Sequence, residues 1–452
     1  MQPHEARKRI AVVGAGISGL SAAWLLGKRH DVVLYERDGR PGGHANTVMA
    51  PSENGPVPID TGFIVYNEAT YPNLVALFDH LGVATKTSDM SFAVSRDGGR
   101  LEYSGAGLGG LFAQKRNMAN PRFWSMLRDL VRFYRSAAAD LAQLPASHTL
   151  GDYLDRGRYG AAFRDDHLLP MAGAIWSAPC STMLGYPASA FIRFFHNHGL
   201  LLLGDRPQWR TVEGGSIAYV RKLTDTFSGS IRLAADIASI VRHDGHVSVF
   251  DRTGRERFDA VVIATHADQA LRLLTDASPE ERSLLGAFGY SRNEAVLHTD
   301  DSAMPRRRSV WSSWNHVDGK AGDEAASVTY WMNRLQRIET PRPLFVTLNP
   351  RTPLDEALVL RRETYQHPIF DQAAMEAQQR LWMLQGRRGT WFCGAHFGSG
   401  FHEDGLQSGL AVAEALGGVK RPWNVAEQSS RITLPEGWPT VPALEAEREI
   451  AA

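Results

Sequence analysis

Near its start the chain reads Arg9-Ile10-Ala11-Val12-Val13-Gly14-Ala15-Gly16-Ile17-Ser18-Gly19-Leu20, an apolar run that leads into three closely spaced glycines. The pattern predicts a strand, a tight turn and a helix, the opening of a dinucleotide-binding βαβ unit. Gly14 permits the turn, Gly16 lets backbone amides approach a pyrophosphate, and Gly19 lets the helix pack closely on the sheet. The helix N-terminus would then offer unpaired N–H groups and a positive dipole end to the phosphates.

An acid follows at the spacing that this unit needs. A second apolar strand, Asp31 to Tyr35, runs directly into Glu36. A carboxylate at this position binds ribose hydroxyls and repels a 2′-phosphate. A lone glycine motif is weak evidence, but here the strand, the helix and the acid occur in the correct order. The sequence therefore predicts a bound adenine dinucleotide.

The residues after the acid distinguish FAD from NAD. Glu36-Arg37-Asp38-Gly39-Arg40-Pro41-Gly42-Gly43-His44 resembles an extension found in flavoprotein oxidases and desaturases and absent from nicotinamide dehydrogenases. The resemblance implies that Gly42 and Gly43 pass close to the FAD pyrophosphate. His44 stands where that superfamily often has arginine. The alternative is a plain surface turn, since Asp-Gly and Pro-Gly pairs form turns.

Two distant segments resemble other parts of the same fold. Ile237–Val241, Gly245–Phe250 and Phe258–Thr265 read as three strands, the last nearly all apolar like a buried central strand. Thr390 to Leu416 reads as a strand, a glycine-rich loop and a helix, similar to the closing unit of flavin amine oxidases. In that family the helix N-terminus points at the flavin ring, and an acid often stands where this chain has Ala395. With three motifs in the correct order, the predicted cofactor is FAD.

The composition excludes several classes of protein. The 452 residues carry 49 basic and 49 acidic side chains, so no net charge draws the chain to nucleic acid. Two cysteines, Cys180 and Cys393, make no disulfide framework and fit a reducing compartment. The chain shows no signal peptide, no metal-ligand spacing and no apolar run near the roughly 20 residues of a membrane span. We expect a cytoplasmic protein without a bound metal.

The motifs predict an α/β fold: a glutathione-reductase-type Rossmann FAD-binding domain with an inserted α+β substrate domain, as in amine oxidases. The FAD-binding domain is expected to be discontinuous, and a C-terminal tail is expected to lie over the surface or to be partly mobile. The predicted ranges are 1–86, 207–274 and 386–421 for the FAD-binding domain, 87–206 and 275–385 for the substrate domain, and 422–452 for the tail.

Patterns in the inserted segments predict the helices and strands of the substrate domain. Ser91–Ser104 reads as a hairpin, and Asn120 to Leu144 reads as a helix. Ala295–Thr299, Ser327–Met332 and Leu344–Thr347 are expected to be strands of one sheet.

Three local strings narrow the resemblance. They are Asn197-His198-Gly199-Leu200 with Asp205–Val212, Tyr330–Gln336 with Phe345–Pro350, and Gly400–Gly405. Together they resemble a bacterial family of predicted NAD/FAD-binding oxidoreductases, commonly labelled flavin-containing amine oxidases, over about Arg9 to Arg421. Members of this family tend to be encoded beside cyclopropane-fatty-acid-synthase-like methyltransferases. The resemblance therefore implies chemistry on lipid acyl chains and a fatty-acid methyltransferase as a partner.

The residues give less support to an amine substrate. Amine oxidases use a lysine that reaches flavin N5 through water and an aromatic pair that flanks the amine. Among the lysines, only Lys320 lies in the third of the chain where that lysine is expected, and it lies in an Asp-Gly loop typical of a solvated charge. The closing motif also lacks the aromatic pair.

A basic segment bears on the lipid interpretation. Arg122 to Arg135 carries apolar residues at helical spacing, with arginines near one edge. Such a helix can lie on anionic headgroups, which would make the chain peripheral to the inner membrane. The alternative is an ordinary helix that buries one stripe against its own domain.

Flavin chemistry asks little of side chains beyond positioning and exclusion of water. His402 and Glu403 open the helix expected to face the flavin and are candidate acid/base groups, and the helix dipole there disfavours a protonated histidine. Arg210 is a third catalytic candidate that would line the flavin cavity. The alternatives are that His402 and Glu403 cap the helix or bond the loop, and that Arg210 makes a structural ion pair.

The predicted cofactor contacts come from all the motifs, including an Asp-Thr-Gly strand end that the superfamily places beside the flavin. They are Gly14, Gly16, Ser18, Gly19, Glu36, Arg37, Gly42, Gly43, His44, Thr61, Gly62, Ile237, Gly394, Gly405 and Leu406. The expected reaction is hydride removal from a substrate carbon to flavin N5, with reoxidation by oxygen or another acceptor. A lipid acyl chain is the favoured substrate. There are two alternatives. Either the substrate is an amine, or the protein holds FAD without turnover and serves as a scaffold for a methyltransferase.

Overall fold

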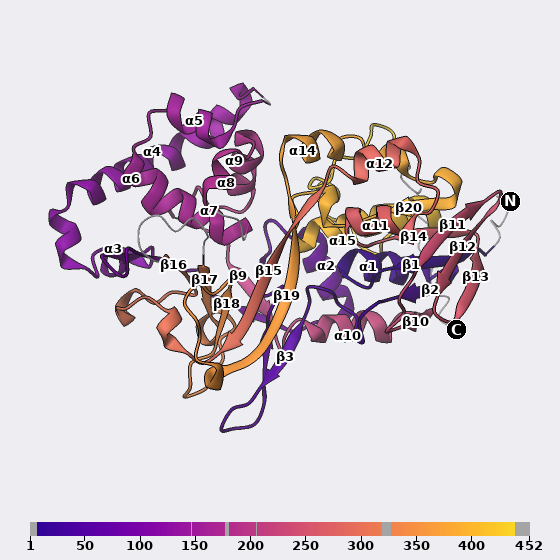
Figure 1. The fold of residues 1–452 in the computed structure, drawn as a ribbon, viewed down its shortest axis with the longest axis horizontal. Coiled ribbons are helices and arrows are strands. Elements are labelled where there is room, and N and C mark those ends of the chain that lie inside the picture. The colour runs from indigo at the N-terminus through magenta and orange to yellow at the C-terminus, as the bar shows by residue number, and fades with distance from the viewer. Residues whose placement is uncertain (1–6, 146, 177–179, 205, 319–326, 439–452) are drawn as a thin grey trace, which may run out of the picture.

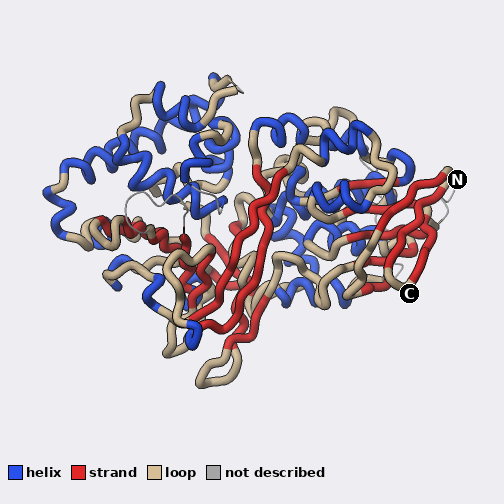
Figure 2. The backbone as a smooth tube through the Cα atoms, in the orientation of Figure 1, coloured by secondary structure: helices blue, strands red, loops and turns tan. Residues whose placement is uncertain are grey.

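The computed structural model describes residues 7–145, 147–176, 180–204, 206–318 and 327–438. Figure 1 shows a small parallel sheet at one end of the molecule and a larger sheet towards the other. Two long strands, β15 (Gly289–His298) and β19 (Val359–Ile369), run through the middle. Figure 2 shows a group of helices above the larger sheet, at the end away from the parallel sheet.

The parallel sheet is assembled from three separate stretches of sequence. Its order is β10-β2-β1-β14-β20, and every neighbouring pair is parallel. The strand bounds are Ser230–Arg232 (β10), Asp31–Tyr35 (β2), Arg9–Val13 (β1), Ala260–Ile263 (β14) and Thr390–Phe392 (β20). Ile10, Ala11 and Val12 are fully buried, as in a central strand covered on both faces. The predicted fold class and the two opening strands are confirmed.

Helices α1 (Ile17–Leu26) and α15 (His402–Gly417) pack against each other beside this sheet. Glycines permit the contact, because a Cβ on Gly409 of α15 would overlap the carbonyl oxygen of Ser18 in α1. All ten residues of α1 are buried. Helix α1 is therefore a central part of the core.

An antiparallel sheet of β11 (Ser239–His243), β12 (His246–Asp251) and β13 (Gly254–Phe258) precedes β14. The three strands predicted in this region are found as β11, β12 and β14, but the structure has a fourth. The prediction missed β13, which pairs with β12 along its whole length. The sequence of β13 is Gly-Arg-Glu-Arg-Phe, and its consecutive charged residues hid the strand pattern.

The larger sheet has seven strands in the order β19-β15-β18-β17-β16-β7-β8. The remaining bounds are Phe345–Leu348 (β18), Ser327–Trp331 (β17), Trp314–Val317 (β16), Phe92–Arg96 (β7) and Leu101–Ser104 (β8). The hairpin of β7 and β8 is confirmed, and β15, β17 and β18 share one sheet as predicted. Strands β16 and β19 were not predicted. In β19 the run Arg361-Arg362-Glu363 interrupts the apolar alternation of a half-buried strand.

A layer of helices completes this end of the molecule. The bounds are Gly107–Leu111 (α3), Lys115–Ala119 (the 3-10 turn η1), Pro121–Asp140 (α4), Leu150–Arg156 (α5), Ala161–Phe163 (α6), Arg164–Leu168 (the π-helical turn η3), Leu169–Trp176 (α7), Cys180–Leu184 (α8) and Ala188–Asn197 (α9). Helix α4 is the predicted helix, and its apolar stripe, including Phe123, Met126 and Phe133, is buried. The structure therefore favours the alternative in which this stripe packs inside its own domain.

Smaller elements connect the two ends. Strand β3 (Thr47–Ala50) pairs with β4 (Val57–Asp60), and β9 (Trp209–Val212) pairs with β5 (Tyr66–Asn67) and β6 (Thr85–Thr87). The other helices are Pro72–Leu81 (α2), Ile217–Asp225 (α10), Ala267–Leu273 (α11), Pro279–Leu285 (α12), Met332–Leu335 (α13) and Gln372–Gln378 (α14). The other 3-10 turns are Leu141–Gln143, Asp301–Ala303, Arg308–Val310, Glu356–Leu358, Leu381–Leu384, Arg387–Gly389 and Ala395–Phe397.

The C-terminal tail is anchored as far as residue 438. Ile432 is buried in the core, and the Trp438 ring lies 4.8 Å from that of Trp382. Arg431 makes an ion pair of 2.6 Å with Asp404 of α15. Up to residue 438 the tail lies over the surface and is held there by these contacts, and residues 439–452 lie outside the described residues. The tail's Pro and Glu content concealed these few anchoring side chains.

Candidate functional site

The turn between β1 and α1 is closed by the predicted acid. Gly14 N–H donates to the Tyr35 carbonyl oxygen at 2.8 Å. One carboxylate oxygen of Glu36 accepts the Ala15 N–H at 2.7 Å, and the other accepts the Asp38 N–H at 2.9 Å. Glu36 therefore lies beside the N-terminus of α1, at the end of β2.

Glycines shape the space in front of α1. Gly14 has a φ of +103°, and a Cβ there would lie 2.9 Å from the Ala264 carbonyl oxygen. A Cβ on Gly19 would overlap the carbonyl oxygen of Gly14, so the helix touches the turn. A Cβ on Gly16, in contrast, would meet no atom within 4 Å. Open space therefore lies at the helix N-terminus, where backbone amides attract anions.

The second glycine pair closes on the first. Gly42 N–H donates to the Ala15 carbonyl oxygen at 2.8 Å, and a Cβ on Gly43 would lie 3.1 Å from Gly16 Cα. Both residues have positive φ, +114° and +57°. The two glycine motifs therefore form one continuous backbone surface.

The arginine that organises this loop was not in the predicted set. Arg37, which was predicted to contact the cofactor, has a side chain that is 69% exposed and lies 3.7 Å from Asp38. Arg40 instead donates to the carbonyl oxygens of Gly43 at 3.0 Å and Ala45 at 3.3 Å. The signal that could have identified Arg40 is its spacing from Glu36 on one side and from the Gly42-Gly43 pair on the other.

Thr61 and Gly62 lie against the glycine-pair loop. A Cβ on Gly62 would overlap the His44 carbonyl oxygen, which also accepts the Phe63 N–H at 2.8 Å. Thr61 Oγ1 bonds to the Tyr365 hydroxyl at 2.6 Å. The strand end that follows β4 therefore joins the loop to β19.

Asp60, which precedes this pair, is a buried anchor. Its carboxylate accepts from Thr47 Oγ1 at 2.6 Å, Ser216 N–H at 2.8 Å and Gln336 Nε2 at 2.9 Å. Burial raises the pKa of Asp60 to about 6, and hydrogen bonds from Thr47 and Ser216 oppose that rise. Asp60 thus ties β4 to the start of α10 and to the segment after α13.

His402 stands at the first position of α15. Its ring stacks on Phe63 with centroids 3.8 Å apart, and Nε2 shares a hydrogen bond of 2.6 Å with the Tyr219 hydroxyl. Burial lowers the pKa of His402 to about 3, so the imidazole is neutral at physiological pH. His402 therefore lies next to the Asp-Thr-Gly strand end, as a neutral group.

Glu403 points the other way and caps α2. Its carboxylate accepts the N–H groups of Asn73 at 3.0 Å and Leu74 at 2.9 Å, and the Nε2 of Gln407 at 2.9 Å. Burial raises its pKa, and hydrogen bonds from Gln407 and Asn73 oppose that rise. These bonds favour the alternative in which Glu403 caps a helix over the one in which it transfers a proton.

The other predicted residues of the closing unit lie where α15 meets α1 and β14. Gly394 N–H donates to Ser408 Oγ at 3.0 Å. A Cβ on Gly405 would lie 2.9 Å from Ile17 Cγ2, so this glycine lets the two helix N-termini approach. Leu406, Ser18 and Ile237 are buried.

Arg210 lies on β9 and makes local contacts. Its Nε donates to Thr85 Oγ1 at 3.0 Å, and its Nη1 lies 3.5 Å from Glu68 Oε1. These contacts favour the structural alternative for Arg210. Lys320, the one lysine considered for an amine-oxidase role, lies outside the described residues.

A group of histidines around His44 escaped sequence reasoning. The ring of His44 lies 5.4 Å from that of His367, 6.5 Å from that of His266 and 5.0 Å from that of Tyr365. Burial lowers the pKa of His44 well below its usual value, and the neighbouring His367 and His266 lower it further. These residues come from separate segments without a common spacing, so no sequence pattern brings them together.

These features fit FAD. The open space at Gly16 suits a pyrophosphate, and the Glu36 carboxylate suits a ribose. Three buried ring nitrogens, His44 Nε2, His266 Nδ1 and His396 Nε2, have no hydrogen-bond partner among the described residues and could bond a polar ligand. The cofactor would be held by the N-termini of α1 and α15 and by the glycine-pair loop, and would supply two-electron chemistry there.

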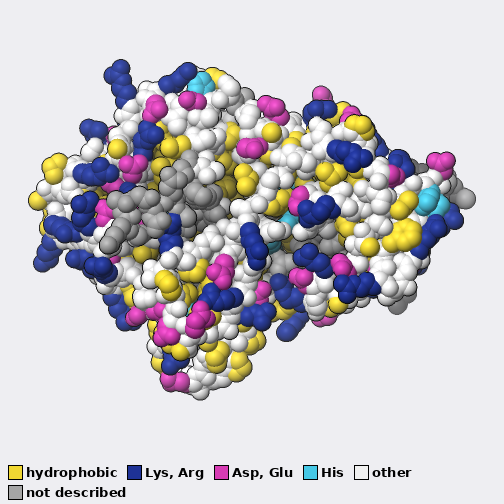
Figure 3. All heavy atoms as spheres, in the orientation of Figure 1, with side chains coloured by type: hydrophobic (Ala, Val, Ile, Leu, Met, Phe, Trp, Pro, Cys, Tyr) yellow, Lys and Arg dark blue, Asp and Glu magenta, His cyan; other side chains and the backbone are white. Residues whose placement is uncertain are grey.

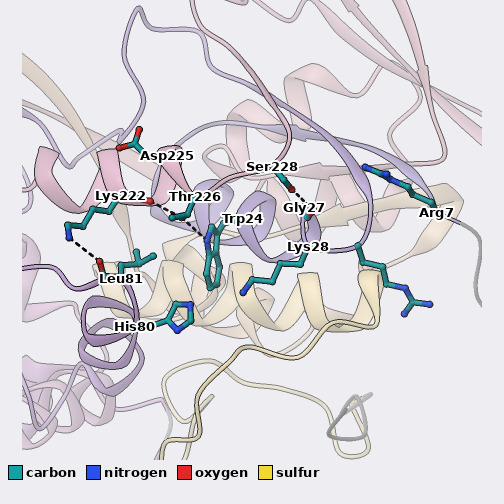
Figure 4. Close-up of a pocket in the computed structure, with 11 residues that line it drawn as sticks. Arg7, Trp24, Gly27, Lys28, His80, Leu81, Lys222, Asp225, Thr226 and Ser228 are labelled. Atoms are coloured by element: carbon teal, nitrogen blue, oxygen red, sulfur yellow. Dashed lines mark hydrogen bonds between the residues drawn. The ribbon is translucent and has the colours of Figure 1, made fainter. Parts of the chain in front are cut away.

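A separate hollow of about 830 Å³ lies at the other end of α1 (Figure 4). Trp24, Lys28, His80 and Lys222 are among its lining residues, and Lys222 Nζ donates to the Leu81 carbonyl oxygen at 3.0 Å. A helix of ten residues is about 15 Å long, so this hollow is distinct from the open space at Gly16.

Glu403 offers a test of capping against catalysis. We expect Glu403→Ala to lower the free energy of unfolding by about 1–3 kcal/mol, because it leaves buried donors at the start of α2 without an acceptor. Turnover per folded, FAD-loaded molecule should persist. The measurement is denaturant unfolding together with flavin content, with exposed Glu376→Ala as the control. An unchanged unfolding free energy with lost turnover would restore the catalytic assignment.

The buried histidines predict a loss of stability in mild acid. Burial lowers the pKa of His367 to about 4 and those of His316, His396 and His402 to about 3, whereas unfolded histidine titrates near 6.5. Between these values the unfolded chain binds more protons, so unfolding becomes easier as the pH falls. Each such group costs about 1.4 kcal/mol per pH unit in this window.

Measuring the Tm of thermal unfolding at a series of pH values from neutral to about pH 5 tests this expectation. The Tm should fall steadily, and His316→Asn should flatten the slope while His246→Asn, on the partly exposed strand β12, should not. A Tm that stays constant over this range would contradict the neutral, buried state of these rings.

Comparison with known proteins agrees with this geometry. The family model described as flavin containing amine oxidoreductase matches residues 17–343. Protoporphyrinogen oxidase 2 (chloroplastic/mitochondrial) of Arabidopsis thaliana is 45% identical over 80 residues, which span 18% of this chain and only 15% of that protein.

Two solved structures share the fold. A CLA-producing fatty acid isomerase from P. acnes has a TM-score of 0.65 at 16% identity, covering 89% of this chain and 97% of its own. Cyclohexylamine oxidase from Brevibacterium oxydans IH-35A has a TM-score of 0.63 at 17% identity, covering 91% of this chain and 100% of its own. The family match extends over more than half of the sequence. The chain belongs to the flavin-containing amine oxidoreductase family and is an FAD-dependent oxidoreductase.

Proposed function

We propose that this oxidoreductase removes a hydride from a carbon of a lipid acyl chain, a desaturation-type oxidation. The observation that carries the proposal is the neutral character of the start of α15. His402 is unprotonated there, and the two acids that follow it are already engaged. A charged ammonium group would find no free carboxylate among the described residues of this helix turn.

The acids at this turn are committed to structural partners. Glu403 accepts three hydrogen bonds from the Asn73 and Leu74 region, and Asp404 pairs with the buried Arg431 at 2.6 Å. Freeing either carboxylate would leave a buried partner uncompensated, which is strongly unfavourable. This arrangement supports a neutral substrate over a cationic one.

Aromatic side chains border the same turn. Phe401 stacks on Phe194 of α9 with centroids 4.7 Å apart, and Phe194 lies 4.7 Å from Trp176 of α7. Phe63 covers His402 from the other side. Such surroundings favour apolar chains, since each buried methylene contributes about 0.8 kcal/mol.

The reaction divides between cofactor and protein. When bound, FAD supplies a two-electron acceptor for a hydride from the substrate carbon. A hydride from one carbon and a proton from its neighbour leave together, and a carbon–carbon double bond remains. We assign His402, whose ring is held by Tyr219, as the neutral group that positions the reacting carbon, and the proton would leave to water. Oxygen or another acceptor would be needed to complete the turnover.

The comparisons bear on this proposal in two directions. The P. acnes protein with the same fold is a fatty acid isomerase, so the fold can accommodate an acyl chain. The family description and the cyclohexylamine oxidase keep an amine as the second candidate. A fatty-acid methyltransferase remains our proposed partner, because it would act on the same class of chain.

Anaerobic titration of the FAD-loaded protein separates these functions. We expect phospholipids with unsaturated or methylated acyl chains to bleach the oxidised flavin band, and polyamines or aromatic amines to leave it unchanged. His402→Ala should keep FAD and slow the bleaching by about 10²-fold, as expected when the reacting carbon is misplaced. Tyr219→Phe is the matched control for loss of the ring's hydrogen bond alone.

Other outcomes of the titration redirect the assignment. Bleaching by amines alone contradicts the acyl-chain proposal and supports an amine oxidase. Bleaching by no candidate supports an FAD-holding scaffold for a methyltransferase. Full bleaching by lipid in His402→Ala removes that residue from the mechanism.

A further inference from the structure

The end of the molecule formed by α3, η1 and the start of α4 exposes large apolar side chains. The fractional exposures are 74% for Leu108, 52% for Met118 and 51% for Trp124. Trp124 Nε1 donates to the Met118 carbonyl oxygen at 2.8 Å, and the Trp124 ring lies 5.7 Å from Phe112. Phe112 N–H in turn donates to the Leu108 carbonyl oxygen at 3.0 Å. We call Leu108, Met118 and Trp124 together the apolar tip.

Positive charge surrounds the apolar tip. Residues 105–128 include Lys115, Arg116, Arg122 and Arg128 and no acidic residue. Arg122 pairs with Asp166 at 2.7 Å and Arg128 pairs with Asp129 at 3.1 Å, so the excess charge comes from Lys115 and Arg116. Lys115 and Arg116 are exposed. Figure 3 shows Lys and Arg side chains gathered at this end of the molecule, with hydrophobic side chains between them.

A basic hollow lies beside the apolar tip. It has a volume of about 580 Å³ and is lined by Arg100, Arg116, Arg306 and Arg307, together with residues 97–99 of the β7–β8 turn. Its acids are already paired, since Asp97 pairs with Arg100 at 2.8 Å and the nearby buried Glu102 pairs with Arg307 at 2.8 Å. Positive charge therefore remains in excess around an opening large enough for a phosphate.

We propose that the apolar tip and its surrounding cations bind the surface of an anionic lipid bilayer. Tryptophan favours the boundary between headgroups and acyl chains, leucine and methionine can enter it, and Lys and Arg attract the anionic headgroups. The tip lies at the end of the molecule away from the parallel sheet, where a flat surface can reach it (Figure 1). None of the helices in the described part of the chain is a candidate for a membrane span.

This surface shares Arg122, Trp124 and Arg128 with the segment that the sequence suggested, but it does not use the apolar stripe of that segment. The apolar stripe of α4 is buried, whereas Trp124 lies on the opposite, exposed side of the same helix. The apolar tip also stands apart from the acyl-chain reaction, because membrane binding requires no turnover. A failure of one proposal therefore leaves the other intact.

Vesicle co-sedimentation of the FAD-loaded chain tests the proposal. We expect binding to vesicles of phosphatidylcholine with phosphatidylglycerol and little binding to phosphatidylcholine alone. A triple variant, Leu108→Ser, Met118→Ser and Trp124→Ser, should reduce partitioning by about tenfold or more. Lys115→Gln with Arg116→Gln should reduce it about fivefold per charge removed.

Matched control variants distinguish binding through the apolar tip from nonspecific hydrophobic binding and from misfolding. Met49→Ser, Leu203→Ser and Met383→Ser remove side chains about as exposed elsewhere on the surface and should leave binding unchanged. Flavin content and Tm verify that each variant folds, and the charge variants test the surface independently of the apolar ones.

Two results would overturn the proposal. One is wild-type protein that stays in the supernatant with anionic vesicles. The other is a folded triple variant that binds as well as the wild type. Self-association through the apolar tip, detected by light scattering and abolished by the triple variant without any vesicle binding, would assign the surface to a second copy of the chain instead.

Discussion

The contact between the glycine turn after β1 and the first turn of α1 is the constraint on which the rest of this structure depends. Gly14 and Gly19 leave no room for a side chain between them, and Gly405 and Gly409 bring α15 equally close to α1. Because a close-packed core has low compressibility, a change at one of these contacts would shift the elements packed against it. The N-termini of two helices consequently lie together with the glycine-pair loop.

This assembly explains why the site is neutral as well as open. The charged groups nearest to the helix ends serve the scaffold: Glu36 closes the turn, Glu403 caps α2, and Asp404 pairs with Arg431. Burial leaves the histidines at the site uncharged. The part of the site that remains for a substrate is therefore aromatic and weakly polar, which is the basis of the acyl-chain proposal.

The local motifs could be predicted because each one is dictated by backbone contacts. The spacing of Gly14, Gly16 and Gly19 identified the turn, and the structure gives each glycine a physical reason. Strand β2 and the β7–β8 hairpin followed from apolar alternation. Strand β13 and strand β19 did not, because runs of consecutive charged residues interrupt that pattern.

The site was harder to predict than the fold, because it depends on long-range packing. His266 and His367 lie close to His44 only through the arrangement of several strands and loops, and no spacing relates them. The direction of a side chain is also invisible in a sequence. His402 and Glu403 are neighbours, yet one faces Phe63 and the other faces α2.

The most direct test of the account is the flavin content of Gly16→Val. Gly16 caps α1 with an extended backbone, and a Cβ there would meet no atom within 4 Å, so we expect the variant to fold like the wild type. It would, however, fill the space assigned to the pyrophosphate. We predict unchanged circular dichroism and no bound FAD. A variant that retains stoichiometric FAD would show that the cofactor is held elsewhere and would contradict the account.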